Sequence, residues 1–295
     1  MEQQQRGGAE AWDLHCHTVF SDGTRTPEQM VVEAQTLGLA GVAITDHDTT
    51  QGWAEARAAG TAHQLPVMLG TEITADDAGV SVHMLAYRYD EHNAALAQLF
   101  EQTRQARLER ARKMVALMAR DYPISWESVL AQVKEGERTT VGRPHIADAL
   151  VAAGVYQTRS EAFAGACSAQ SPYYLPTPSP SAQEVVQAVK AAGGVAVVAH
   201  PGAVNRNRVL LSDQQIKQLA DLGLDGLEVW HRDNDDQQRE RLLGLAERFR
   251  LLVTGGSDWH GAGKPNRLGE NTTPQATVDE IIARSPEQTA RQYGR

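Results

Sequence analysis

The chain has 295 residues, of which 41% are hydrophobic and 22% charged, and its formal net charge is −9. These values suit a globular protein with ample core and argue against a protein that binds duplex nucleic acid through a broad basic surface. The sequence has no signal peptide, no run near the ~20 apolar residues of a membrane span, and only two cysteines, Cys16 and Cys167, so we expect a cytoplasmic protein with no membrane partner.

The first predicted strand, 12–17, contains the run Asp-Leu-His-Cys-His at 13–17. In a strand, residues i and i+2 point to the same side, so His15 and His17 project together. Two imidazoles on a stiff element make half of a metal site. An isolated pair of this kind is more often two histidines that alternate with core residues, so the rest of the chain must decide.

The first ninety residues alternate between strand and helix patterns. A helix starts at Pro27 after the cap Thr26, and a second helix is predicted over 50–59. Apolar runs predict strands over 41–45, 67–73 and 80–87. This alternation is typical of a parallel α/β barrel or sheet.

The alternation breaks at about residue 91. One long helical pattern covers 93–120, shorter ones follow at 126–134, 145–153 and 160–167, and a proline-rich return covers 171–180. We interpret 93–180 as a helical insertion. Within it, Thr-Val-Gly-Arg-Pro-His at 140–145 places Arg143 and His145 at a helix start, where anions bind readily.

The strand and helix alternation resumes at residue 181, with strands predicted over 195–199, 226–230 and 251–254. Histidines and acids gather in or just after the predicted strands of both halves. Sites form at the carboxyl ends of strands in barrels and in doubly wound sheets. Each residue alone could be a satisfied core residue, but their coincidence predicts a polynuclear site for zinc, iron or manganese. The residues are His15, His17, Asp22, Asp46, His47, Glu72, His83, His200, His231, Asp258 and His260.

Five motifs resemble those of the PHP (polymerase and histidinol phosphatase) superfamily, in that family's order. They are Asp-Leu-His-Cys-His-Thr at 13–18, Ile-Thr-Asp-His-Asp at 44–48, Gly-Thr-Glu at 70–72, Ala-His-Pro-Gly at 199–202 and Gly-Ser-Asp-Trp-His at 256–260. The resemblance implies an α/β fold, a distorted (β/α)7 TIM-like barrel of the PHP type. Its parts would be a discontinuous barrel of 12–92 and 181–285, a helical insertion or lid domain over 93–180, and a flexible N-terminus over 1–11.

The resemblance also implies three divalent transition metals, manganese, iron or zinc, as cofactors. One metal would be bound by His15, His17, Glu72 and Asp258. A second would share Glu72 as a bridge and use His83 and His200, and the third would use Asp22, His47 and His260. The chain departs from the family pattern at one point. An arginine usually stands soon after His-Pro-Gly, whereas here the run is Ala-Val-Asn-Arg at 203–206.

The insertion resembles that of small PHP phosphoesterases acting on nucleotides, which include nucleoside 3′,5′-bisphosphate phosphatases and RNA-trimming 5′→3′ exonucleases. We therefore expect hydrolysis of a nucleotide phosphomonoester, of the AMP or 3′,5′-bisphosphate type, by a metal-activated hydroxide. Glu72, Asp258 and His231 are the expected catalytic residues. Arg143, His145 and His231 are the expected substrate contacts, since an arginine fork binds phosphate in bidentate fashion.

Several roles stay open. His231 either contacts phosphate, donates a proton to the leaving oxygen, or packs against Trp230 or Trp259. Asp46 and Asp48 are expected to orient His47 rather than to bind metal.

The partner is expected to be a small phosphorylated substrate or a short oligonucleotide. A histidinol-phosphate-like phosphatase and a 5′→3′ exonuclease on short RNA are the alternatives within this chemistry. An amidohydrolase-type barrel also begins with His-x-His, but no lysine ends a predicted strand here. The alternative from a different functional class is a non-catalytic, metal-dependent nucleotide-binding module. The complete set of metal ligands counts against this alternative.

Overall fold

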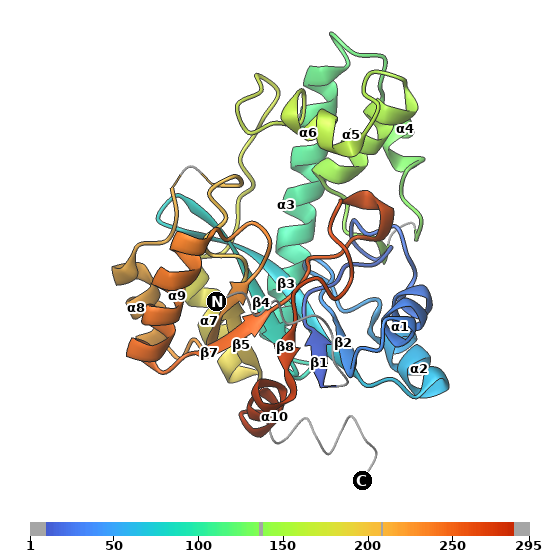
Figure 1. The fold of residues 1–295 in the computed structure, drawn as a ribbon. Coiled ribbons are helices and arrows are strands. Elements are labelled where there is room, and N and C mark those ends of the chain that lie inside the picture. The colour runs from blue at the N-terminus through green and yellow to red at the C-terminus, as the bar shows by residue number, and fades with distance from the viewer. Residues whose placement is uncertain (1–9, 136–137, 208, 286–295) are drawn as a thin grey trace.

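The computed structural model describes residues 10–135, 138–207 and 209–285, and its centre is one eight-stranded sheet (Figure 1). The strands are hydrogen-bonded in the order β7-β6-β5-β4-β3-β2-β1-β8. Their bounds are β1 (Ala11–Asp13), β2 (Gly41–Ile44), β3 (Val67–Asp77), β4 (Val80–Tyr87), β5 (Val195–Val198), β6 (Gly226–Trp230), β7 (Leu252–Gly255) and β8 (Thr273–Pro274).

Helices cover the outside of this sheet, and their apolar faces supply most of the larger core. The barrel helices are α1 (Pro27–Thr36), α2 (Trp53–His63), α7 (Ala182–Ala191), α8 (Asp213–Asp221), α9 (Asp236–Phe249) and α10 (Gln275–Ala283). Thr26 caps α1 as predicted, because its side chain accepts a hydrogen bond from the Gln29 N–H at 3.2 Å. In the part of the chain that the structure describes, no helix combines the length and the apolar character that crossing a membrane requires.

The sheet departs from an all-parallel barrel at β4, which runs antiparallel to both β3 and β5. The cause is the connection between β3 and β4, which is a two-residue turn rather than a helix. Ala78 and Gly79 both have positive φ, 53° and 86°, as a tight hairpin turn requires. Strand β8, which also pairs antiparallel, with β1, was not predicted as a separate strand.

The two edges of the sheet meet at the side chain of Thr273 in β8. Its hydroxyl oxygen accepts a hydrogen bond from the Gly255 N–H at 2.8 Å and donates one to the Gly255 carbonyl at 2.8 Å. A hydroxyl can do both because it has one donor and two acceptor positions. This contact joins β8 to β7 without a backbone ladder, so the sheet forms a nearly closed barrel.

The insertion forms the upper part of the molecule in Figure 1. It contains α3 (Ala94–Met118), α4 (Trp126–Leu130), α5 (Arg143–Ala152) and α6 (Arg159–Ala164). These helices enclose a hydrophobic core of their own, which includes Met114, Val129 and Leu150. The separate core supports the expected boundaries at 93 and 180, which remain a proposal. The expected flexible segment 1–11 falls outside the described residues except for Glu10 and Ala11, and Ala11 already belongs to β1.

The insertion lies over the loops that follow β1 and β2. The Thr140 N–H donates to the Phe20 carbonyl at 3.0 Å, and Arg159 donates to the Asp22 carbonyl at 2.9 Å. Arg107 of α3 donates to Asp48 at 3.1 Å. These contacts place the inserted helices directly beside the strand ends where histidines and acids gather.

The contact between β7 and β8 makes a stability prediction. Thr273→Val keeps the shape of this fully buried side chain but leaves the Gly255 N–H without its acceptor, which should lower the free energy of unfolding by about 1–3 kcal/mol. Urea unfolding measures this change, and Thr273→Ser, which keeps the hydroxyl, is the control. Equal stability of the Val and Ser variants would show that the hydroxyl does not hold the barrel closed.

Candidate metal centre

The segment after β1 carries the first two histidines. The strand itself ends at Asp13 rather than at the predicted residue 17, because the following backbone bonds to two different loops. The Cys16 carbonyl accepts the Thr45 N–H at 2.9 Å, while the His17 N–H donates to the Trp259 carbonyl at 2.8 Å. The segment stays extended, so the alternation holds. The two Nε2 atoms of His15 and His17 face each other at 3.2 Å.

Glu72, inside β3, lies at the centre of the histidines. Its Oε2 is 3.3 Å from His15 Nε2, 3.0 Å from His17 Nε2 and 3.3 Å from His47 Nδ1. Its Oε1 is 2.8 Å from His83 Nδ1 and 3.1 Å from His200 Nε2. One buried carboxylate therefore faces five imidazoles, which come from four different segments of the chain.

Two further carboxylates complete the cluster. Asp258 Oδ1 lies 3.6 Å from His15 Nε2 and 3.4 Å from His17 Nε2. Asp22 Oδ1 lies 3.0 Å from His260 Nε2, and its Oδ2 lies 3.9 Å from His47 Nε2.

Three groups offer ligand atoms that all lie within 4.8 Å of one another. They are His15, His17, Glu72 and Asp258; His17, Asp22, His47 and His260; and His47, Glu72 and His83. The first group is identical to the first expected ligand set. The group of His17, Asp22, His47 and His260 contains the third expected set and adds His17 to it. The group of His47, Glu72 and His83 shares Glu72 and His83 with the second expected set. The structure thus brings together all nine residues that the sequence nominated as metal ligands.

The hydrogen bonds of the imidazoles fit a bound cation. His260 Nδ1 donates to the Asp258 carbonyl at 2.8 Å, so a neutral His260 presents the lone pair of Nε2 to Asp22. That Nε2 atom makes no hydrogen bond although the carboxylate oxygen is only 3.0 Å away. His15 Nδ1 likewise donates to Glu228 at 2.9 Å, which turns its Nε2 atom toward Glu72. Lone pairs that converge on carboxylate oxygens are the arrangement that a divalent metal stabilises.

Two groups of the cluster already have the protonation state that binds metal. Although burial opposes it, His83, His15 and His47 hold the pKa of Glu72 well below its usual range, so this carboxylate stays ionised. Burial and the charge of Arg206 lower the pKa of His200 to about 3, so this imidazole is neutral. Ionised carboxylates and neutral imidazoles are the forms that bind metal. His15 and His17 differ: although burial opposes it, the surrounding carboxylates raise the pKa of His15 well above its ordinary value and that of His17 to about 9, so a metal bound here would replace the protons of these two rings.

Glu228 and Ser21 fix the orientation of the central imidazoles. Glu228, fully buried in β6, accepts the His15 Nδ1–H and also the His200 N–H at 2.8 Å. Ser21 lies 3.3 Å from His17 Nδ1 and donates its own hydrogen to Asp46 at 2.6 Å. Sequence reasoning overlooked Glu228, although an acid within a buried apolar strand is a signal for such a role.

The expected roles of Asp46 and Asp48 need correction. Asp46 acts on His17 through Ser21 instead of orienting His47, and it also accepts the Thr18 N–H at 2.7 Å. Asp48 accepts the Thr74 N–H at 2.8 Å and the guanidinium of Arg107 at 3.1 Å. It therefore ties the strand end to the insertion.

Two cations lie at the edge of the cluster. Arg206 Nη2 and Lys264 Nζ approach the same oxygen, Asp258 Oδ2, at 2.7 and 2.8 Å. Both side chains remain partly exposed, at 27% and 29%. The sequence placed Arg206 outside the usual spacing after His-Pro-Gly, yet its side chain reaches the centre. Lys264 was not nominated at all, because it lies in a loop without a motif.

His231 is fully buried beside the cluster, and its ring centroid lies 5.3 Å from that of His200 and 6.4 Å from that of His15. Its Nδ1 accepts the Asp233 N–H at 3.1 Å. Burial, with the charge of Arg206, holds its pKa well below the ordinary value, so the ring is neutral and its Nε2 carries the hydrogen. That N–H lies 3.9 Å from Asp258 Oδ2 without a hydrogen-bond partner.

The two residues nominated in the insertion, both in the first turn of α5, make different contacts. His145 is buried, its Nδ1 accepts the Gly142 N–H at 3.2 Å, and burial lowers its pKa. Arg143 donates to the Cys167 carbonyl at 3.2 Å and lies over the rings of Phe163 and Tyr174. No metal-ligand group contains either residue in the ranges that the structure covers.

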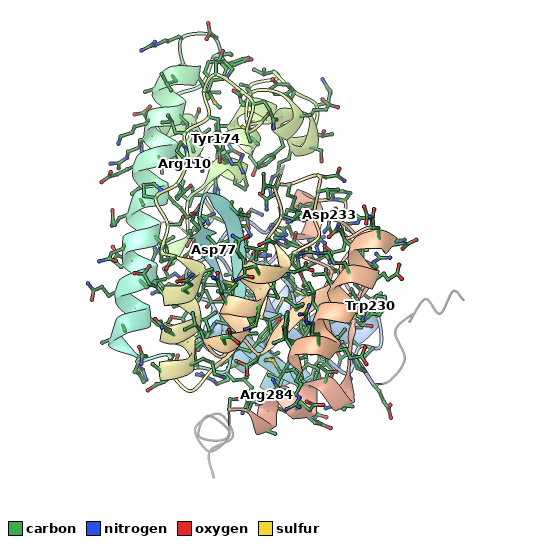
Figure 2. The ribbon with its side chains drawn as sticks, turned by 90° about the vertical axis from the view of Figure 1, so that its left-hand side faces the viewer. Asp77, Arg110, Tyr174, Trp230, Asp233 and Arg284 are labelled. Atoms are coloured by element: carbon green, nitrogen blue, oxygen red, sulfur yellow. The ribbon has the colours of Figure 1, made fainter. Side chains whose placement is uncertain are left out.

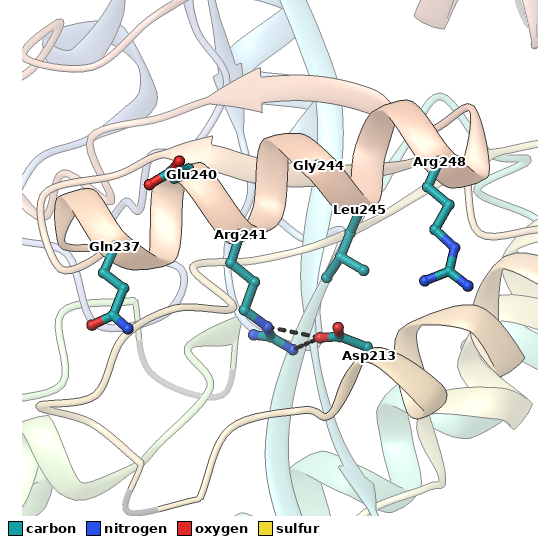
Figure 3. Close-up of a pocket in the computed structure, with 7 residues that line it drawn as sticks. All are labelled: Asp213, Gln237, Glu240, Arg241, Gly244, Leu245 and Arg248. Atoms are coloured by element: carbon teal, nitrogen blue, oxygen red, sulfur yellow. Dashed lines mark hydrogen bonds and ion pairs between the residues drawn. The ribbon is translucent and has the colours of Figure 1, made fainter.

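A pocket of about 440 Å³ lies on the outer helical layer, between α8 and α9 (Figure 3). Arg241 and Asp213 form an ion pair of 2.7 Å across it. None of its lining residues belongs to the histidine cluster, so the pocket is not the centre of the chemistry.

Comparison with known proteins gives one family. Residues 13–192 match the family described as "PHP domain". A solved structure from Bifidobacterium adolescentis, assigned as a metal-dependent phosphoesterase, is 63% identical with a TM-score of 0.93, and the match covers 95% of this chain and 98% of that one.

Two curated relatives are named for their activity. A 3′,5′-nucleoside bisphosphate phosphatase of Chromobacterium violaceum is 31% identical over 86% of this chain and 89% of the relative. A phosphoribosyl 1,2-cyclic phosphate 1,2-diphosphodiesterase of Eggerthella lenta is 32% identical over 84% of this chain and 94% of the relative.

The position of Glu72 generates a prediction on metal content. Glu72→Gln removes the charge that faces five imidazoles, so metal binding should fall, and the loss of turnover should exceed the 10–100-fold typical of a residue outside the ligand set. Elemental analysis of gently purified protein measures the metal, with circular dichroism as the control for folding. Wild-type metal content and near-normal rates in this variant would remove Glu72 from the centre.

Proposed function

This chain belongs to the PHP domain family and is a metal-dependent phosphoesterase, and from that premise we propose that it hydrolyses a phosphomonoester of a nucleotide. The observation that carries the proposal is the convergence of five imidazoles on Glu72, with Arg206 and Lys264 at the edge of the same cluster. Ligands for divalent metals lie there next to cations suited to a phosphate dianion.

We assign three metal positions, for manganese, iron or zinc. His15, His17, Glu72 and Asp258 would hold the first, and Glu72 with His83 and His200 the second. Asp22, His47 and His260 would hold the third, with His17 near enough to contribute. Divalent metals in such sites supply hydroxide near neutral pH and stabilise the charge of the phosphoryl oxygens.

Protein side chains do the remaining work. Arg206 and Lys264 can exchange their contacts with Asp258 for the phosphoryl oxygens of the substrate, since both are charged donors. The Nε2–H of His231 can donate a hydrogen bond to a phosphoryl or leaving oxygen, because the neutral ring presents it without another partner. Glu228 keeps His15 turned toward the centre, so its role is positioning.

The substrate class rests on the relatives together with the insertion. The Chromobacterium violaceum relative is named for 3′,5′-nucleoside bisphosphates, and that of Eggerthella lenta for a cyclic phosphate diester. The insertion bonds to the loops beside the centre through Arg107 on Asp48 and Arg159 on the Asp22 carbonyl, which supports a role for its residues in contacting what is attached to the scissile phosphate. We therefore favour a nucleotide monoester of the AMP or 3′,5′-bisphosphate type. Histidinol phosphate, short 5′-phosphorylated RNA and non-catalytic binding remain the alternatives for the test.

Phosphate release from a substrate panel tests the proposal. The panel holds AMP, adenosine 3′,5′-bisphosphate, histidinol phosphate, p-nitrophenyl phosphate, its bis ester and a short 5′-phosphorylated RNA, each with Mn²⁺, Fe²⁺ or Zn²⁺. Nucleotide monoesters should give the highest kcat/KM, and Glu72→Gln is the inactive control. Binding of nucleotides without any turnover would favour the non-catalytic module, and faster turnover of the bis ester would make this a diesterase.

Lys264 makes a separate prediction. Lys264→Met removes a charged donor 2.8 Å from Asp258 Oδ2, which should cost roughly 1.5–3 kcal/mol, or about ten- to a hundredfold in kcat/KM for the best monoester. Lys217→Met is the matched control, because Lys217 pairs with Asp221 on an exposed helix face. Steady-state kinetics of both variants decide, and equal rates would exclude Lys264 from phosphate binding.

A further inference from the structure

The insertion is bonded to the loop that carries Asp22, a residue assigned to the third metal position. Figure 2 shows the insertion, with Arg110 and Tyr174, at the top of the molecule and the barrel below it. Four donor groups of the insertion bond backbone carbonyls of this loop. The bonds run from the Thr139 hydroxyl to Val19 at 2.9 Å, from the Thr140 N–H to Phe20 at 3.0 Å, from Arg159 to Asp22 at 2.9 Å and from Lys134 to Thr24 at 2.8 Å. The insertion therefore holds the loop by its backbone.

The bonds within the loop use other carbonyls. The N–H groups of Ser21 and Gly23 both donate to the Thr18 carbonyl, at 3.1 and 2.9 Å, and the Val19 N–H donates to the Arg25 carbonyl at 2.9 Å. A metal ligand on a loop is positioned less precisely than one on a strand, unless neighbouring groups hold the loop. The insertion supplies such groups for the loop of Asp22.

Arg159 has the most central place among these donors. Its Nε and Nη2 bond the two carboxylate oxygens of Asp148, Nε at 2.7 Å, which directs Nη1 to the Asp22 carbonyl. A Cβ at Gly263 would lie 2.4 Å from Arg159 Nη1, so the guanidinium also lies against the turn that follows His260. Arg159 therefore contacts the segments of two ligands of the third position.

Those two segments are bonded to each other by their backbones. The N–H and the hydroxyl of Thr24 both donate to the His260 carbonyl at 3.1 Å, and the Ala262 N–H donates to the Thr24 hydroxyl at 2.8 Å. These bonds bring Asp22 Oδ1 to 3.0 Å from His260 Nε2. The spacing of the two ligands thus depends on a backbone arrangement that Arg159 touches on both sides.

The remaining ligand of the third position also has an insertion contact beside it. Arg107 bonds Asp48, the residue that follows His47, at 3.1 Å. The other positions are held from within the barrel, because Glu228 accepts hydrogen bonds from His15 Nδ1–H and from the His200 N–H. The third position is therefore the one whose geometry depends most on the insertion.

We propose that the insertion sets the metal affinity of the third position, and that Arg159 is the positioning residue through which it does so. The inference rests on the proposed function, which assigns this position, and goes beyond it by making metal occupancy depend on the seating of the insertion. Because coupling between two binding events is reciprocal, a metal at this position also strengthens the docking of the insertion on the barrel.

The charge of Arg159 alone would have the opposite effect. A guanidinium beside Asp22 repels a divalent cation, so removal of the charge would by itself strengthen metal binding. Loss of positioning weakens metal binding, by the 10–100-fold that is typical of groups that orient ligands. The direction of the change in affinity separates the two effects.

Equilibrium dialysis against Mn²⁺, followed by elemental analysis, counts the metals bound per chain at each free concentration. We expect three equivalents in the wild-type protein. Arg159→Met keeps the length of the side chain and removes its donors, so the third equivalent should require about tenfold or more Mn²⁺ while the other two bind as before. Arg159→Lys keeps a charged donor and should recover part of the affinity.

Two further variants show whether Arg159 acts through Asp22. Asp22→Ala should leave two equivalents, and Arg159→Met added to it should change nothing more. A further loss in this double variant would overturn the assignment of Arg159 to the third position. Arg112→Gln is the matched control, because Arg112 lies in the insertion but packs over Trp126, and it should bind three equivalents with wild-type affinity.

Unchanged or tighter binding of the third equivalent by Arg159→Met, in protein of normal melting temperature, would overturn the positioning role. Fewer than three equivalents in the wild-type protein at saturating Mn²⁺ would overturn the third position and this inference with it. Absence of turnover on every phosphate ester by protein that holds three metals would instead overturn the proposed function, and the weaker binding by Arg159→Met would still support the role of the insertion.

Discussion

The structure depends on the burial of one carboxylate, Glu72, among five imidazoles. A buried carboxylate is costly unless charge and hydrogen bonds compensate it. Here its two oxygens face ring nitrogens at 2.8 to 3.3 Å, and two of those rings are oriented through their other nitrogen, His15 by Glu228 and His17 by Ser21. A divalent metal can satisfy carboxylate and imidazole together, so folding and metal binding are coupled at this point.

Backbone strain accumulates around the same centre. Asp48, His200 and Asp258 have positive φ values of 52°, 32° and 52°, a region that L side chains adopt at a cost of order 1–3 kcal/mol. Each lies just after a strand, where the chain must turn sharply while its side chain points into the cluster or onto the insertion. The barrel tolerates this strain because its large apolar core and the contact at Thr273 stabilise the strands around it.

The residues that the sequence nominated as ligands lie close together in the structure, because their chemistry and their place at strand ends are both visible in the sequence. Strand β4 was predicted with the bounds that it has, Val80–Tyr87, since its alternation is regular. Its antiparallel direction was missed, because it depends on the two-residue turn at Ala78-Gly79. Glu228, Arg206 and Lys264 were missed as site residues for a different reason. Their roles arise only when segments distant in sequence meet, and no local pattern distinguishes a lysine that reaches Asp258 from one on the surface.

The division of labour between barrel and insertion follows from what each can recognise. Metal-ligating side chains with two cations beside them are suited to a phosphoryl group whatever its substituent, so they cannot by themselves select a nucleotide. The insertion is positioned by Arg107 on Asp48 and by Arg159 on the Asp22 carbonyl, two residues that lie next to or among the ligands. The inserted helices are therefore held in a fixed position beside the cluster of metal-ligating side chains. A surface held in a fixed position beside the cluster can select a substrate by what is attached to its phosphate, because binding at both places requires a matching geometry.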